Sequence, residues 1–299
     1  MRRPSAVLWF VLAFIAIAAP AWAQSPDTSL AVGGRVWVTT GYSLNSTQVS
    51  DLRWRGVDSV VPEVNVDWVW KRLVVMGSLG GGAIKQGVLI DEDFEDGARI
   101  SRTRSDTDDT GLLYVNADVG YRLWQWGTPE QPGFIDGLVG FQYWYERYVA
   151  FGATSAFPDV VPPISSDIRV ITQEWHWYSL RLGGRTQIPL FGGLGLKARA
   201  FVLPWSRSVV NDIHHLRTDL RRDPSFHDEA DGGIGVQADG GLTYRVWRGL
   251  SVEAGFQYWR ISSGEGTSTA HTIFGDFDGK LRENRTERYG PYVGVQYRF

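Results

Sequence analysis

The sequence predicts an all-β protein, a ten-stranded antiparallel transmembrane β-barrel with long extracellular loops. Three observations predict this fold. Apolar and polar residues alternate in many segments, the alternating segments are long, and tryptophan recurs where several of them end. Alternation with a period of two turns one row of side chains toward lipid and the other toward the lumen. The 35 glycines and 13% aromatic residues among 299 residues suit long strands joined by tight turns.

The N-terminal residues have the pattern of a secretory signal peptide. A basic start, a long apolar run and an A-x-A motif at residues 21–23 follow one another in the expected order. We therefore expect a signal peptide at 1–23 and a single barrel domain at 24–299. The chain has no cysteine, so the exported domain must be stabilised without disulfides, by burial and backbone pairing.

Ten alternating segments define the predicted strands. The last is the clearest, because odd positions from Tyr289 to Phe299 are mainly apolar and even positions are small or polar. These segments reach 14 residues or more, whereas strands of a soluble β-sandwich usually have about 5–6. The predicted strands cover residues 30–44, 52–69, 73–90, 111–125, 135–152, 173–188, 195–211, 233–247, 250–265 and 284–299.

Short and long connections alternate between these strands. Short periplasmic turns and long outer loops are typical of outer-membrane barrels, and an even strand number places both termini in the periplasm. Tryptophans precede the short turns and predict an aromatic girdle at that interface. They are Trp68, Trp70, Trp124, Trp126 and Trp247.

A barrel of this size encloses too little space for an open pore, so we expect side chains to fill the lumen. Candidates are Asp239, Arg245, Glu253, Gln257 and Tyr292. The net charge of -3 gives no basic surface for nucleic acid. We expect a monomer whose partners are the membrane and a peptide or protein substrate.

Two short stretches carry the candidate chemistry. Asp91 and Asp93 follow the predicted third strand, and Asp212 and His214 follow the seventh. Residues two apart on an extended backbone point the same way. An aspartate beside a histidine makes a general base, whereas two close aspartates tend to retain a proton. Facing each other across a barrel mouth, such pairs can hold and activate a water that attacks a peptide carbonyl.

These stretches resemble the omptins, outer-membrane aspartic-type endopeptidases of Gram-negative bacteria. Leu89-Ile90-Asp91-Glu92-Asp93-Phe94 is similar to the family's D-x-D-aromatic motif, and Asn211-Asp212-Ile213-His214 to its N-D-x-H motif. The resemblance spans nearly the whole exported domain. It implies an extracellular site in which Asp212 and His214 activate water while Asp91 and Asp93 bind it. It also implies an outer-membrane location.

The substrate pocket departs from the family pattern. Omptins use acidic residues there to bind a basic residue, but the corresponding candidates here are Val210 and Asn45. The resemblance therefore predicts proteolysis with a specificity that need not be for basic residues. It also predicts dependence on lipopolysaccharide, for which Arg147 and Arg181 are the candidate phosphate contacts. We expect no other cofactor and no metal ion, since the stretch after Asp91 departs from a calcium loop.

One geometric difficulty concerns the seventh strand. Its even residues from Leu196 to Val202 are apolar, so strict alternation would turn Asp212 and His214 toward lipid. A bulge near Pro204 would reset the alternation. Two functions other than proteolysis stay open from the sequence, namely a non-catalytic adhesin or surface receptor and a porin.

Overall fold

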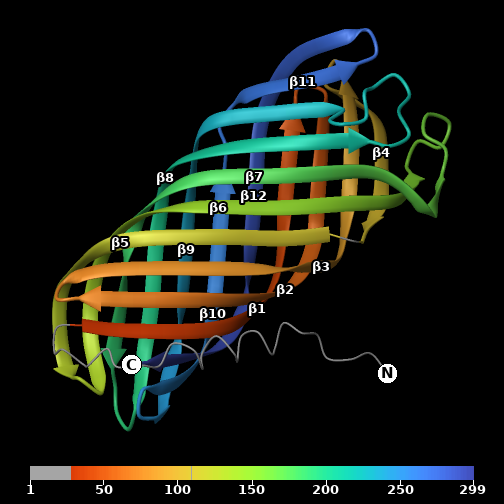
Figure 1. Ribbon diagram of the computed structural model, residues 1–299. Coiled ribbons are helices and arrows are strands. Elements are labelled where there is room, and N and C mark those ends of the chain that lie inside the picture. Colours follow the sequence, from red (N-terminus) through yellow and green to blue (C-terminus); the bar gives the residue numbers. More distant parts are fainter. Residues whose placement is uncertain (1–27, 109) are drawn as a thin grey trace.

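The computed structural model describes residues 28–108 and 110–299, which form one closed antiparallel barrel (Figure 1). A ring of about 10 strands closes where β1 pairs with β12. The predicted all-β barrel is therefore confirmed. The predicted signal peptide at 1–23 lies outside the described residues. Within the described part, no helix is both long and apolar enough to cross a membrane.

Twelve strand segments build the ring. Their bounds are β1 (Thr28–Thr47), β2 (Ser50–Trp70), β3 (Leu73–Glu95), β4 (Ala98–Thr107), β5 (Thr110–Thr128), β6 (Gln131–Ser155), β7 (Ile164–Pro189), β8 (Leu194–His214), β9 (Phe226–Trp247), β10 (Leu250–Ser262), β11 (Gly266–Thr272) and β12 (Gly275–Arg298).

Two positions in the ring are each filled by two segments. The residues of β3 up to Ile84 pair with β5, and those from Val88 onward pair with β4. In the same way, β9 and β12 flank β10 toward one end of the barrel and β11 toward the other. The predicted loops at 91–110 and 266–283 are therefore wrong in large part, because both form hairpins that extend the wall. Both hairpins are mainly polar, and they lack the apolar face by which we recognised strands.

The two ends of the barrel differ. The turns β2–β3, β5–β6, β7–β8 and β9–β10 are short and lie at one end, here called the turn end, where Phe299 hydrogen-bonds to Leu30. The β3–β4 and β11–β12 hairpins rise at the other end, here called the mouth (Figure 1). Large apolar residues face outward mainly between the turn end and mid-height, as Leu79 and Val202 illustrate, at 52% and 51% exposure, and a few others such as Phe274 are exposed at the mouth.

This outward apolar band gives the wall its lipid-facing surface. Trp68, Trp70, Trp124 and Trp247 are exposed near the turn end, as predicted for the girdle. Trp126 follows Trp124 in the same register and is half-buried against Gly133. The β5–β6 register shifts between Arg122 and Trp124, and this irregularity turns Trp124 outward although Arg122, two residues before it, is buried.

Four aromatic side chains close the middle of the lumen. Trp37, Tyr114, Trp144 and Trp259, here called the aromatic plug, are at most 5% exposed. Trp259 contacts the other three with ring centroids 4.8–5.4 Å apart, and each such pair adds about 0.5–1.5 kcal/mol beyond its burial. A Cβ at Gly80 would lie 2.3 Å from the Tyr114 ring, so this glycine makes room for the plug.

Polar side chains fill the lumen on the turn side of the plug. The Arg35 guanidinium lies 2.8 Å from Glu63 and stacks on the Tyr292 ring, and Arg199 pairs with Asp239 at 2.8 Å. The residues expected in the lumen, Asp239, Arg245, Glu253, Gln257 and Tyr292, all lie there. These contacts compensate charges that would otherwise be costly inside a narrow barrel.

The plugged lumen predicts that the barrel does not conduct ions. We expect no stable conductance steps when the purified protein is inserted into planar bilayers, because buried rings occupy the path between the mouth and the turn end. A porin inserted into the same bilayers serves as the positive control. Ohmic steps that scale with salt concentration would contradict the closed lumen and support the porin hypothesis.

Candidate functional site

The first acidic pair projects into the mouth from β3. Leu89 is 1% exposed in the core, and alternation along the strand turns Asp91 and Asp93 to the same inner side. Ser101, which pairs with Asp93 across the β3–β4 ladder, donates a 2.6 Å hydrogen bond to Asp93 Oδ2. Both aspartates thus lie within β3 rather than after it, and β4 holds the pair in place.

A bulge in β8 turns the second pair inward. Leu203 pairs with Gly235, whereas Ser206 pairs with Gly233, so β8 contains one more residue than β9 between these pairs. The β7–β8 register shifts at the same height. Below the bulge odd residues such as Leu203 are buried, and above it even residues such as Ser206 and Asp212 are buried. The bulge predicted near Pro204 is present and resolves the difficulty of alternation.

Asp212 and His214 form an ion pair within this inward row. His214 Nε2 lies 3.4 Å from Asp212 Oδ1, and the Asp212 side chain is only 4% exposed. The Phe226 ring packs edge-on against the imidazole with centroids 5.3 Å apart. Ser225 accepts a hydrogen bond from the backbone N–H of His214 and donates its own N–H to the Asp212 carbonyl. The end of β8 is therefore fixed on both sides of the ion pair.

Gln173 holds the other oxygen of Asp212. It faces Asp212 across the β7–β8 ladder and donates a 2.9 Å hydrogen bond to Oδ2. Its own carbonyl accepts the indole N–H groups of Trp54 at 2.6 Å and Trp175 at 3.3 Å. Because two donors bind the carbonyl oxygen, the amide nitrogen must point to Asp212. This network leaves Oδ1 of Asp212 for His214.

The two pairs interact across the mouth without touching. The charges of Asp212 and His214 both act on Asp91, which places the pairs within electrostatic range. No hydrogen bond or ion pair joins Asp91 or Asp93 to Asp212 or His214, all four being among the described residues. Nδ1 of His214 likewise has no hydrogen-bond partner within 28–108 and 110–299. The arrangement suits a small molecule held between the pairs.

Both pairs lie beyond the apolar band, and their pKa values move toward neutrality. Burial, together with the negative charge of Asp93, raises the pKa of Asp91 to about 7. Burial opposes protonation of His214, but the Asp212 carboxylate outweighs it and raises the His214 pKa above its ordinary value of 6.5. Near pH 7 Asp91 is therefore partly protonated, and the His214 imidazole holds a proton more readily than an ordinary histidine.

The two residues assigned to the substrate pocket have buried side chains. Val210 is fully buried and Asn45 is 2% exposed. Asn45 donates hydrogen bonds to Asp228 Oδ2 at 2.5 Å and to Asn284 at 2.8 Å. Asp228 is directly opposite Val210 across the β8–β9 ladder. An acidic residue thus lies beside the pocket, on the strand next to the one where the family pattern expects it.

Burial of the ionised Asp228 carboxyl is energetically unfavourable. Burial raises its pKa to about 6 from an ordinary 3.8. The difference corresponds to about 3 kcal/mol of unfavourable free energy for the ionised carboxyl. This cost is absent below pH 3.8, sets in as pH rises from 3.8 to 6, and is complete above 6. Such a group one strand away from Asp212 adds negative potential beneath the pocket.

The two arginines predicted to contact lipopolysaccharide point in opposite directions. Arg147 lies on the outer wall, 3.3 Å from Glu174, and its phosphate role stays a prediction. Arg181 lies in the lumen, 3.3 Å from Asp118, with its guanidinium over the Phe201 ring. The assignment of Arg181 is wrong, because Leu180 and Leu182 occupy the outward positions of β7 and turn the residue between them inward.

Sequence reasoning missed three residues that shape the site: Gln173, Ser225 and Asp228. Gln173 begins a predicted strand but has no motif, and its role depends on a partner 39 residues away. Ser225 and Asp228 lay in the predicted loop 212–232, whose second half is in fact the start of β9. Extending the alternation below residue 233 would have turned Asp228 outward with Ile234, because only the register shift between Gly233 and Ala230 places it on an inward row. Among the described residues, no group of three or more His, Asp or Glu is arranged to hold a metal ion.

Comparison with known proteins supports the fold. No protein-family model and no curated protein matches the sequence. The structure is similar to the outer membrane protease OmpT from Escherichia coli, with a TM-score of 0.75, 13% identity, and coverage of 94% of this chain and 99% of that one. The outer membrane protein AlkL matches with a TM-score of 0.35, 14% identity, and coverage of 94% and 95%. The chain thus has the OmpT fold.

Replacing Asp212 by Asn tests the origin of the histidine pKa. Without the carboxylate charge, burial and Arg217 oppose protonation of His214 and only the weaker effect of Asp91 favours it, so we expect the His214 pKa to fall below that of the wild type. An NMR pH titration of the imidazole in detergent micelles measures the change. Asp276→Asn is the matched control, since it removes a carboxylate 3.0 Å from another histidine, His271. An unchanged His214 pKa in the Asp212→Asn variant would contradict the ion pair.

Proposed function

We propose that this protein is an outer-membrane endopeptidase that hydrolyses peptide bonds with an activated water. The observation that carries the proposal is the convergence of two unlike pairs on one mouth, Asp91 with Asp93 and Asp212 with His214. The fold shared with an outer membrane protease supports it. The proposed orientation places the mouth outside the cell and the turn end in the periplasm.

The reaction assigns a role to each group. A water between the pairs hydrogen-bonds to the Asp91 and Asp93 carboxyls and to Nδ1 of His214. Nδ1 takes a proton as the water oxygen bonds to the peptide carbonyl carbon, and His214 later gives that proton to the departing amine. Asp212 stabilises the imidazolium in between, and Gln173 keeps Asp212 oriented. No covalent bond forms between the enzyme and the substrate.

In the proposed function, the substrate pocket favours a substrate residue with an uncharged side chain. Val210 is apolar, and the amide of Asn45 already binds the carboxylate of Asp228. Hydrogen bonds from Asn45 and Ser268 compensate part of the Asp228 charge. The residues found next to the cut bonds in a randomised peptide library report this preference. Enrichment of Lys or Arg next to the cut bond would overturn it and assign the recognition of basic residues to Asp228.

Activity is tested with purified barrel in detergent and lipopolysaccharide, a randomised peptide library, and mass spectrometry of the products. We expect cleavage by the wild type, because His214 is paired with Asp212 and the Asp91–Asp93 pair projects into the same mouth. Asp212→Ala and His214→Ala should each lower kcat/KM by about 10²- to 10⁴-fold, the usual contribution of a general base. Omission of lipopolysaccharide shows whether activity depends on it.

His271→Ala is the matched control, since it removes a mouth histidine that is bound to Asp276 rather than to Asp212. Its activity should equal that of the wild type. Equal cleavage by the wild type and both site variants would contradict the proposal. An absence of cleavage with ligand binding that survives His214→Ala would instead support the adhesin or receptor hypothesis.

A further inference from the structure

A cavity of about 1380 Å³ occupies the lumen between the aromatic plug and the turn end. Its walls include the β5–β6 and β7–β8 turns and the start of β1, so it opens at the turn end. Arg35 and Tyr292 line it on the side of the plug. Because the plug separates it from the mouth, this cavity is distinct from the candidate active site. Its volume exceeds the roughly 300–1,000 Å³ of typical small-molecule sites.

The cavity wall carries an excess of positive charge. Nine Arg or Lys side chains line it, against four Asp or Glu side chains. Two more carboxylates, Glu63 and Asp136, bind wall arginines from behind. Three positive charges therefore exceed the side-chain carboxylates counted together. A concave wall of one sign concentrates the field and attracts ions of the opposite sign.

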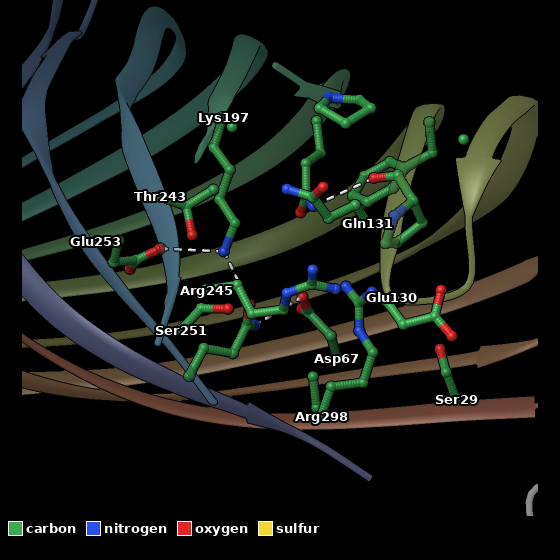
Figure 2. Close-up of a pocket in the computed structure, with 18 of the residues that line it drawn as sticks. Ser29, Asp67, Glu130, Gln131, Lys197, Thr243, Arg245, Ser251, Glu253 and Arg298 are labelled. Atoms are coloured by element: carbon green, nitrogen blue, oxygen red, sulfur yellow. Dashed lines mark hydrogen bonds and ion pairs between the residues drawn. The ribbon is translucent and has the colours of Figure 1, made fainter. Parts of the chain in front are cut away.

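Within the part of the chain that the structure describes, four of these cations lack a carboxylate partner: Lys71 and Arg248, which are exposed at the rim, and Arg245 and Arg298, which are half-buried. Arg185 contacts both Asp67 and Asp136, and Lys197 contacts Glu253. Arg245 and Arg298, in contrast, make no side-chain hydrogen bond or ion pair with any residue in 28–108 or 110–299. Both are half-buried on the inner wall. Figure 2 shows them in the same part of the cavity as Asp67, Ser251 and Lys197.

A buried hydroxyl beside these cations is an independent sign of a ligand. Thr243 lines the cavity and is 7% exposed, and its Oγ1 has no hydrogen-bond partner within the described residues. In Figure 2 it lies next to Lys197. An unpaired buried hydroxyl costs free energy unless a ligand or water satisfies it. Lys197, whose ammonium also binds Gln296 at 2.8 Å, offers a charge at the same place.

We propose that this cavity binds a water-soluble small molecule that carries two or more negative charges on phosphate or carboxylate groups. Guanidinium groups bind both kinds of oxyanion through paired N–H donors. The half-buried guanidiniums of Arg245 and Arg298 match two anionic groups, and Thr243 matches a further acceptor. The closed strand wall excludes the acyl chains of a lipid, so the ligand enters from water at the turn end.

Isothermal titration calorimetry with pyrophosphate, and separately with citrate, tests the proposal on the whole barrel in neutral detergent at constant ionic strength. We expect saturable binding of one anion per barrel. The double variant Arg245→Gln and Arg298→Gln should bind about tenfold or more weakly, since it removes two charged hydrogen-bond donors. Arg72→Gln is the matched control, because this arginine is at the turn end but stacks outside on Tyr121.

Two results would overturn the proposal. One is no saturable binding of either anion by the wild type. The other is equal affinity in the double variant and in Arg72→Gln, which would make the cavity a solvated vestibule that attracts anions without a site. Thr243→Val provides a milder second variant should the double variant not fold, and it should weaken binding severalfold. Because no step involves proteolysis, the outcome is independent of the proposed function.

Discussion

The alternation of side chains along each paired strand determines what every functional group in this barrel faces. A closed ring leaves no edge at which a strand can shift alone, so an inward row stays inward until a bulge inserts a residue. The bulge at Pro204–Trp205 in β8 is the decisive one. Below it the even residues face outward in the apolar band, and above it they face the mouth. Without this extra residue Asp212 and His214 would point away from Asp91 and Asp93.

The aromatic plug gives the lumen two chambers with different chemistry. On the mouth side, Trp54 stacks on Tyr148 with ring centroids 4.7 Å apart and donates to Gln173, which orients Asp212. Tyr148 in turn contacts the fully buried ion pair of Glu146 and Arg288. The candidate site thus rests on a rigid buried layer rather than on loops. On the turn side, the same plug ends a cavity whose cations are only partly paired.

The ring of strands and the catalytic candidates were predictable because both leave local patterns. Alternation over long segments identified every position in the ring, and the i, i+2 spacing identified Asp91, Asp93, Asp212 and His214. Arg181 shows the limit, since proximity to aromatic residues in sequence suggested an outer position that its own alternation contradicts. Gln173 and Asp228 act through partners on other strands, so only the register of β7, β8 and β9 reveals them.

The central claim is that one water lies between the Asp91–Asp93 and Asp212–His214 pairs. A crystal structure of the barrel at a resolution that defines ordered water tests it most directly. The predicted result is a water within about 3 Å of His214 Nδ1 and of a carboxyl oxygen of Asp91 or Asp93, the range of ordinary hydrogen bonds. A side chain filling the space between the pairs, or pairs too far apart for one water to contact both, would contradict the account.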